Sequence, residues 1–220
     1  MGHLADFFHG NRKNLRGRIA RALPHWNRDD KGYGFVLGMQ AFGLKICGGY
    51  GEAEDNGRQA FEAEPDDCWA QHAVAHLMEM QARQDEAVTF MGAREDNWAQ
   101  DDNGFAFHNW WHVALFNLDN DRTDRVLPIY DRGIRAEPEP VQMMMLDAVA
   151  LLWRLHLRGI ELGTRWDDLM ATCEVADEDG FYAFNDMHAM MAYVATGRTA
   201  ASAALLESVE KAAHQTGTTA

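Results

Sequence analysis

Two pairs of histidines are the residues of this sequence best suited to chemistry. His72 and His76 lie in the segment HAVAH. His108 and His112 lie in the segment HNWWH, with the same spacing of four residues. On a helix this spacing places both side chains on one face, with about 5–6 Å between their Cβ atoms. Imidazole binds zinc, iron, nickel and copper and titrates near neutral pH, so the pairs predict metal ligands, proton-transfer groups, or polar residues that hydrogen-bond between helices.

The surrounding residues do not choose between these roles. The sequence contains neither the HExxH motif of zinc proteases nor the Glu-x-x-His motif of di-iron bundles. Carboxylates are available at Glu79, Asp147 and Asp186, but none has a diagnostic spacing from a histidine. For any one histidine a structural hydrogen bond is favoured, because buried polar groups are usually satisfied rather than catalytic. For the group, a ligand site and a metal-free network stay open, and we expect the metal-free network.

The elements that carry these histidines are predicted to be helices. Apolar residues recur mostly at spacings of three and four, and the alternation typical of strands is nearly absent. One broad face of the segment 69–80 is shared by Trp69, Ala73, His76, Leu77 and Met80. The sequence therefore predicts an all-α protein.

The predicted helices are grouped in pairs. Short polar breaks such as ARQDEA, LDNDRTD and ATGRTA separate the two helices of a pair, and Pro65 and Pro138 lie in the longer breaks between pairs. We expect a right-handed stack of about five antiparallel helical pairs, which is a tetratricopeptide-like solenoid. The stack is expected to form a single domain over residues 1–214, followed by a disordered tail at 215–220.

Several stretches resemble the tetratricopeptide repeat protein 38 family. They are LRGRIARALPHW (15–26), GYGFVLGMQAFGL (32–44), WAQHAVAHLMEMQAR (69–83), HNWWHVALFNLD (108–119), LLWRL (151–155) and AFNDMHAMMAYVATGR (183–198). The resemblance covers the chain from about residue 15 to residue 198 and corresponds to the C-terminal part of the family's length. It implies a helical-repeat fold and carries over no biochemical activity.

The repeat register places the histidines on the inner helices of the stack. His72, His76 and His108 fall in slots that face the concave groove, as the resemblance implies. His112 and His188 fall nearer the packing between helices, and Trp111 faces the groove, whereas Trp110 takes the packing slot. The predicted ligand-binding set is His72, His76, His108, Trp111, His112, Asp186 and His188. We expect at least three of the five histidines to line one concave pocket.

Composition limits the partners and the compartment. The 220 residues carry a formal net charge of -14, so nucleic acid and membrane surfaces are not expected partners. Cys47, Cys68 and Cys173 are scattered, which favours a reducing compartment and no disulfide framework. The sequence shows neither a signal peptide nor an apolar run of membrane-spanning length, and we expect a cytoplasmic protein.

Two functions are compatible with these features. The first is a binding module that holds a protein, a peptide or a small-molecule ligand in a histidine- and tryptophan-lined groove. The second is an enzyme or metal-binding protein with hydrolase- or lyase-type chemistry, whose core set is His76, His108, His112 and His188. The catalytic residues, the metal and any other cofactor stay open. No P-loop, dinucleotide fingerprint or GxSxG motif is present.

Overall fold

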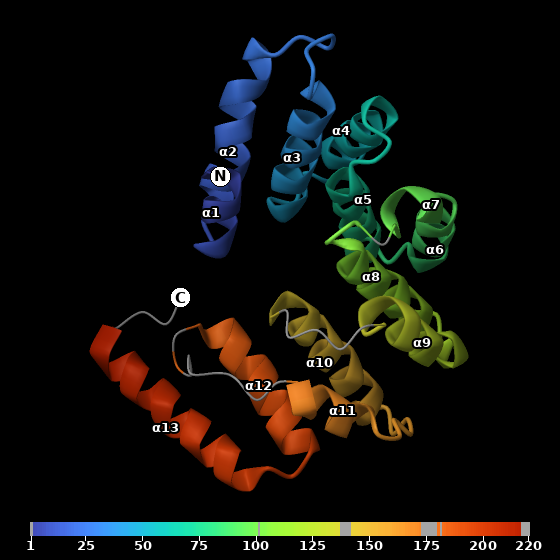
Figure 1. Ribbon diagram of the computed structural model, residues 1–220. Helices are drawn as coiled ribbons and strands as arrows, with labels where there is room; N and C mark the ends of the chain where they lie inside the picture. Colours follow the sequence, from blue (N-terminus) through green and yellow to red (C-terminus); the bar gives the residue numbers. More distant parts are fainter. Residues whose placement is uncertain (1, 101, 137–141, 173–179, 181, 217–220) are drawn as a thin grey trace. The chain divides into compact units, whose positions relative to one another are not determined.

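A computed structural model describes residues 2–100, 102–136, 142–172, 180 and 182–216 (Figure 1). Over these residues the chain forms thirteen α-helices, a short 3-10 helix and a short π-helix, and no strand. The prediction of an all-α protein is confirmed. No helix of the described ranges is long and apolar enough to cross a membrane.

The chain divides into two compact units, Met1–Leu127 and Pro128–Ala220. The first unit contains α1 (Gly2–Phe8), α2 (Arg12–Ala22), η1 (Leu23–His25), α3 (Tyr33–Ile46), α4 (Tyr50–Ala63), α5 (Cys68–Met80), α6 (Gln84–Gly92), α7 (Glu95–Trp98) and α8 (Ala106–Asp119). The boundary falls within α9 (Thr123–Ile129), which carries Pro128. The second unit contains η2 (Tyr130–Ile134), α10 (Gln142–Leu157), α11 (Arg165–Thr172), α12 (Ala183–Ala195) and α13 (Thr199–Thr216).

Helices of the first unit pack mainly against their neighbours in the sequence. α1 packs on α2, α2 on α3, α3 on α4, α4 on α5 and α5 on α6, and α8 contacts both α5 and α6. Glycines allow some of these close approaches. A Cβ added at Gly57 of α4 would lie 2.5 Å from the side chain of Val74 on α5, and one at Gly43 of α3 would lie 2.8 Å from the Cα of Arg16 on α2.

Helix α5 is anchored at its start by Asp67. The Asp67 carboxylate accepts hydrogen bonds from the backbone N–H groups of Trp69 and Ala70, at 3.0 and 3.2 Å, which is a side-chain N-cap. Burial raises the pKa of this carboxyl to about 6. The helix ends at Met80, and Ala82 follows with a φ of 56° in the left-handed region. This cap and this turn fix the length of the helix that carries His72 and His76.

The second unit is organised around α10. Its side chains Leu151, Leu152 and Leu155 are fully buried, and α10 packs against η2, α11 and α12. α12 also packs against α13. Arg165 at the start of α11 donates to Asp131 of η2 at 2.8 Å, which ties these two elements together. The π-helix η2 had no counterpart in the sequence analysis.

The predicted helix breaks agree with the observed ends. α5 ends before Gln81 and α6 begins at Gln84, and α12 ends before Thr196 and α13 begins at Thr199. Pro65 lies between α4 and α5, as predicted, whereas Pro138 lies outside the described residues. Of the predicted tail, residues 215 and 216 belong to α13 and residues 217–220 lie outside the described residues. The single domain over 1–214 stays a prediction, since each unit is described by itself.

Candidate metal centre

Four histidines meet where α5 packs against α8. His72 and His76 come from α5, and His108 and His112 come from α8. One ring nitrogen from each of the four lies within 4.8 Å of the other three. Five of the pairs of ring centroids are 4.2 to 5.0 Å apart. The four imidazoles thus form one cluster, here called the histidine cluster.

The local sequence explains why the four rings converge. The spacing of four residues puts each pair on one face of its helix, and both faces are directed at the helix interface. Three small residues beside the histidines of α5 are fully or almost fully buried, namely Ala70, Ala73 and Ala75. His72 is 4% exposed and His112 is 0% exposed, whereas the His76 side chain keeps 24% of its exposure. The cluster is therefore buried on one side and reaches solvent near His76.

Burial keeps the imidazoles of α5 neutral. Desolvation is the largest cause that lowers the pKa of His72 well below 6.5, and repulsion from protonated forms of the neighbouring histidines lowers it further. The pKa of His76 is lowered well below 6.5 by desolvation first and then by repulsion from His112, Lys45 and His108, and Lys45 also acts on His72. A neutral imidazole offers the lone pair that a metal ion requires. The two groups therefore need no deprotonation step at neutral pH before they can act as ligands.

The shortest contact in the cluster joins His72 and His108. Their Nε2 atoms are 3.0 Å apart, so one ring donates and the other accepts when both are neutral. Two nitrogens bound to one zinc ion at about 2.0–2.1 Å lie about 3.3 Å apart in tetrahedral geometry. The observed separation is close to this value. Small side-chain movements would let the same pair serve as adjacent ligands.

Glu79 lies at the partly exposed edge of the cluster. Its Oε2 atom is 3.4 Å from Nδ1 of His112 and 3.7 Å from Nδ1 of His76, and its side chain is 29% exposed. It is three residues after His76 on the same helix, so it shares that helix face. Sequence reasoning noted Glu79 but gave it no role, because the spacing matches no established metalloenzyme motif.

Aromatic side chains surround the imidazoles. Phe42 of α3 stacks on His72 with ring centroids 5.8 Å apart, and the Phe105 ring lies 5.0 Å from both His72 and His108. Trp111 stacks on His108 at 5.5 Å with an angle of 12° between the rings. Trp69 in turn stacks on Phe105 at 3.9 Å. This apolar surround lowers the local dielectric and limits the access of water, which strengthens any charge interaction inside it.

Lys45 is a second buried charged group near the cluster. It is 8% exposed, and its Nζ lies 5.1 Å from the centre of the Phe42 ring. Burial lowers its pKa to about 8, although attraction to Glu79 opposes the shift. Sequence reasoning missed Lys45 and Phe42. Their spacing of three residues on one predicted helix was the available signal.

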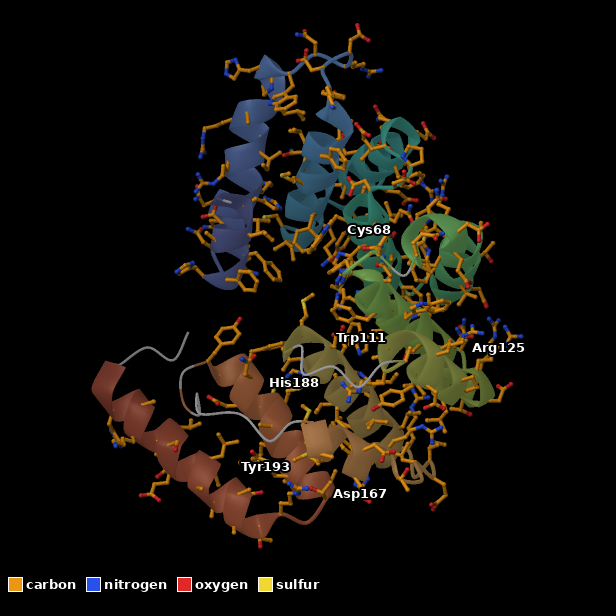
Figure 2. The ribbon with its side chains drawn as sticks, in the orientation of Figure 1. Cys68, Trp111, Arg125, Asp167, His188 and Tyr193 are labelled. Carbon is orange, nitrogen blue, oxygen red and sulfur yellow. The ribbon has the colours of Figure 1, made fainter. Side chains whose placement is uncertain are left out.

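The two tryptophans of the HNWWH segment contact different groups of residues. The ring of Trp111, which Figure 2 labels, has its centroid 5.5 Å from that of His108 and 4.9 Å from that of His112. Trp110 is half-buried and contacts the fully buried Trp98, with ring centroids 4.8 Å apart. Trp98 is fixed by a hydrogen bond from its Nε1 to the carbonyl oxygen of Met91.

The remaining predicted ligands, Asp186 and His188, lie in the second unit on α12, and Figure 2 labels His188. Nδ1 of His188 donates to the carbonyl oxygen of Phe184 at 2.7 Å, and burial lowers the pKa of His188. Asp186 accepts a hydrogen bond from the backbone N–H of Gly180 at 3.1 Å. Four of the five predicted histidines thus form the histidine cluster, and His188 has a local structural contact on another helix.

No protein-family model matches the sequence. The resemblance to the tetratricopeptide repeat protein 38 family therefore stays a prediction. Among the described residues, the histidine cluster is the group whose geometry fits a bound metal ion.

Proposed function

We propose that this protein binds one divalent transition-metal ion through His72, His76, His108 and His112. The observation that carries the proposal is the convergence of four imidazole nitrogens within 4.8 Å of one another. Hydrogen bonding between histidines is the alternative, and it accounts for the contact between His72 and His108. That contact joins two of the four rings, whereas a metal ion accounts for the convergence of all four.

The donor set favours borderline metal ions. Imidazole suits Zn²⁺, Ni²⁺, Cu²⁺ and Fe²⁺, whereas Mg²⁺ and Ca²⁺ prefer oxygen ligands. The nearby Cys68 thiol contacts Asn103 at 3.6 Å, and burial raises its pKa, so it is not prepared to act as a thiolate ligand. We expect zinc or nickel to bind without a thiolate contribution.

Equilibrium dialysis against zinc, followed by elemental analysis, tests the proposal. The wild-type protein should retain one equivalent of zinc. His76→Ala and His108→Ala remove partly exposed ligands and should each abolish retention, while His25→Ala removes an exposed histidine of the same unit and serves as the matched control. Retention of zinc by both ligand variants, or its loss from the control, would contradict the proposal.

A second candidate function is recognition of a protein, peptide or small-molecule ligand by a tetratricopeptide-like stack. Sequential packing within each unit supports the stack. The exposed apolar side chains Leu4, Phe7, Phe8, Phe35, Met39 and Trp69 on α1, α3 and α5 support recognition, because exposed apolar patches often mark interaction sites. A peptide array probed with wild type and with Trp69→Ser tests it, and equal binding by both would count against this surface. A cytoplasmic location is part of this proposal and rests on the sparse cysteines.

A further inference from the structure

The carboxylate of Glu79 faces histidines from two different helices. Its Oε2 atom lies within ion-pair distance of Nδ1 of His76 on α5 and of Nδ1 of His112 on α8. At 3.7 and 3.4 Å these contacts are longer than hydrogen bonds, and a closure of about 0.5–0.8 Å would bring both into hydrogen-bonding range. Because the His112 side chain has no exposed area, water does not compete for this ring.

A carboxylate beside Nδ1 determines which nitrogen of a neutral imidazole carries the proton. An ionised carboxylate only accepts hydrogen bonds, so it stabilises the Nδ1–H form and leaves the lone pair on Nε2. The same arrangement is common behind metal-bound histidines, where the carboxylate fixes the ring orientation and raises the basicity of the ligand nitrogen. Glu79 is placed to do this for two rings at once.

We infer that Glu79 is the positioning residue of the metal centre, and that it holds His76 and His112 as Nδ1–H tautomers so that both present Nε2 to a zinc-like divalent ion. This inference rests on the proposed metal binding and deepens it. His72 and His108 already approach each other through their Nε2 atoms. The centre is then an all-Nε2 site of four neutral ligands, with the compensating negative charge outside the ligand shell.

The arrangement also explains the position of Glu79 at the edge of the cluster. Zinc bound by four neutral imidazoles keeps its full charge of two, and an aromatic surround makes that charge costly. A carboxylate one ring away reduces the cost without occupying a coordination position. A carboxylate bound directly to the metal would give a different ligand field, so the two roles are separable by spectroscopy.

Nitrogen NMR of the metal-free protein tests the tautomers. Long-range proton–nitrogen spectra of the wild type at pH 7.5 should show His76 and His112 as Nδ1–H tautomers. In Glu79→Gln and Glu79→Ala the population of this tautomer should fall, most of all in the alanine variant. Glu62→Gln, which removes an exposed carboxylate on α4, should leave it unchanged. Unchanged tautomers in Glu79→Ala would overturn the inference.

Cobalt titration of the same variants tests the effect on the metal. We expect Glu79→Gln to weaken Co²⁺ binding by about 10- to 100-fold relative to Glu62→Gln, with the visible absorption bands unchanged in position. Altered bands would show Glu79 to be a ligand and would overturn the positioning role. Affinity within twofold of the control would overturn it too, while leaving the proposed function standing. Failure of the wild type to bind cobalt and zinc would overturn both. Glu79→Asp, which keeps the charge, should recover part of the affinity and serves if the other variants fold poorly.

Discussion

Replacement of Lys45 by methionine should stabilise the protein near neutral pH. Methionine keeps an unbranched chain in the same space and removes the buried ammonium group. The lysine is 8% exposed, and burial lowers its pKa from 10.5 to about 8. A difference of this size between the unfolded and folded states corresponds to about 3 kcal/mol of destabilisation when the lysine is charged in both.

The sign of the pH dependence follows from proton counting. Below pH 8 both states bind the proton, so the cost of the buried charge is fully present. Between pH 8 and 10.5 the unfolded state binds more protons than the folded state, so stability rises with pH. The advantage of Lys45→Met should therefore shrink from about 3 kcal/mol at pH 7 to about 1 kcal/mol at pH 10.

Urea denaturation at pH 7 and pH 10 measures both effects. The difference between the wild type and Lys45→Met cancels the titration of other groups, and Lys31→Met provides a matched control because Lys31 is exposed. Loss of the contact between Lys45 and the Phe42 ring should reduce the gain by about 0.5–1 kcal/mol. A less stable Lys45→Met protein at pH 7, or a difference independent of pH, would refute the reasoning.

Three further predictions follow from the surroundings of the cluster. Because burial lowers the folded-state pKa of His72 and His76, the unfolded state binds more protons below pH 6.5, and stability should fall on acidification by up to about 2.7 kcal/mol per pH unit. Urea denaturation at pH 7, 6 and 5 measures how the free energy of unfolding changes with pH. This dependence should weaken when His72 and His76 are both replaced by glutamine. Asp67→Ala should destabilise the protein by about 0.5–2 kcal/mol in thermal unfolding, whereas Asp67→Asn, which keeps the cap, should cost less. Equal losses would argue against the cap. Trp110→Ala should reduce the free energy of unfolding more than Trp111→Ala, since Trp110 packs on Trp98 whereas Trp111 lies on the histidines. Chemical denaturation of both variants measures the two losses. A larger loss in Trp111→Ala would show that the predicted repeat register, which gives Trp110 the packing slot, is wrong.

The spacing of apolar residues and the positions of polar, helix-breaking segments predicted much of the fold. Spacings of three and four identified the helices, and the break between α5 and α6 was visible because polar residues interrupt the apolar pattern. The π-helix η2 was not predictable in this way. It follows Pro128, and a proline within a helical pattern indicates a disturbance without specifying its geometry.

The histidine cluster was predictable only in part. The spacing of four residues placed each pair on one face, but the contact between His72 and His108 depends on how α5 and α8 pack, which no local pattern encodes. His188 was assigned to the same surface by analogy of register, and that assignment stays a prediction because His188 belongs to the second unit, where its Nδ1 donates to the carbonyl oxygen of Phe184. Glu79 was discounted for its spacing, although its role depends on a ring of another helix.

Zinc K-edge X-ray absorption of the protein loaded with one equivalent of zinc identifies the ligand atoms of the metal site. We expect a first shell of four nitrogen atoms at about 2.0–2.1 Å, with the outer-shell scattering typical of imidazole rings and no sulfur. A shell made of water and carboxylate oxygens, or a sulfur contribution at about 2.3 Å, would contradict the assignment of the four histidines as the metal site.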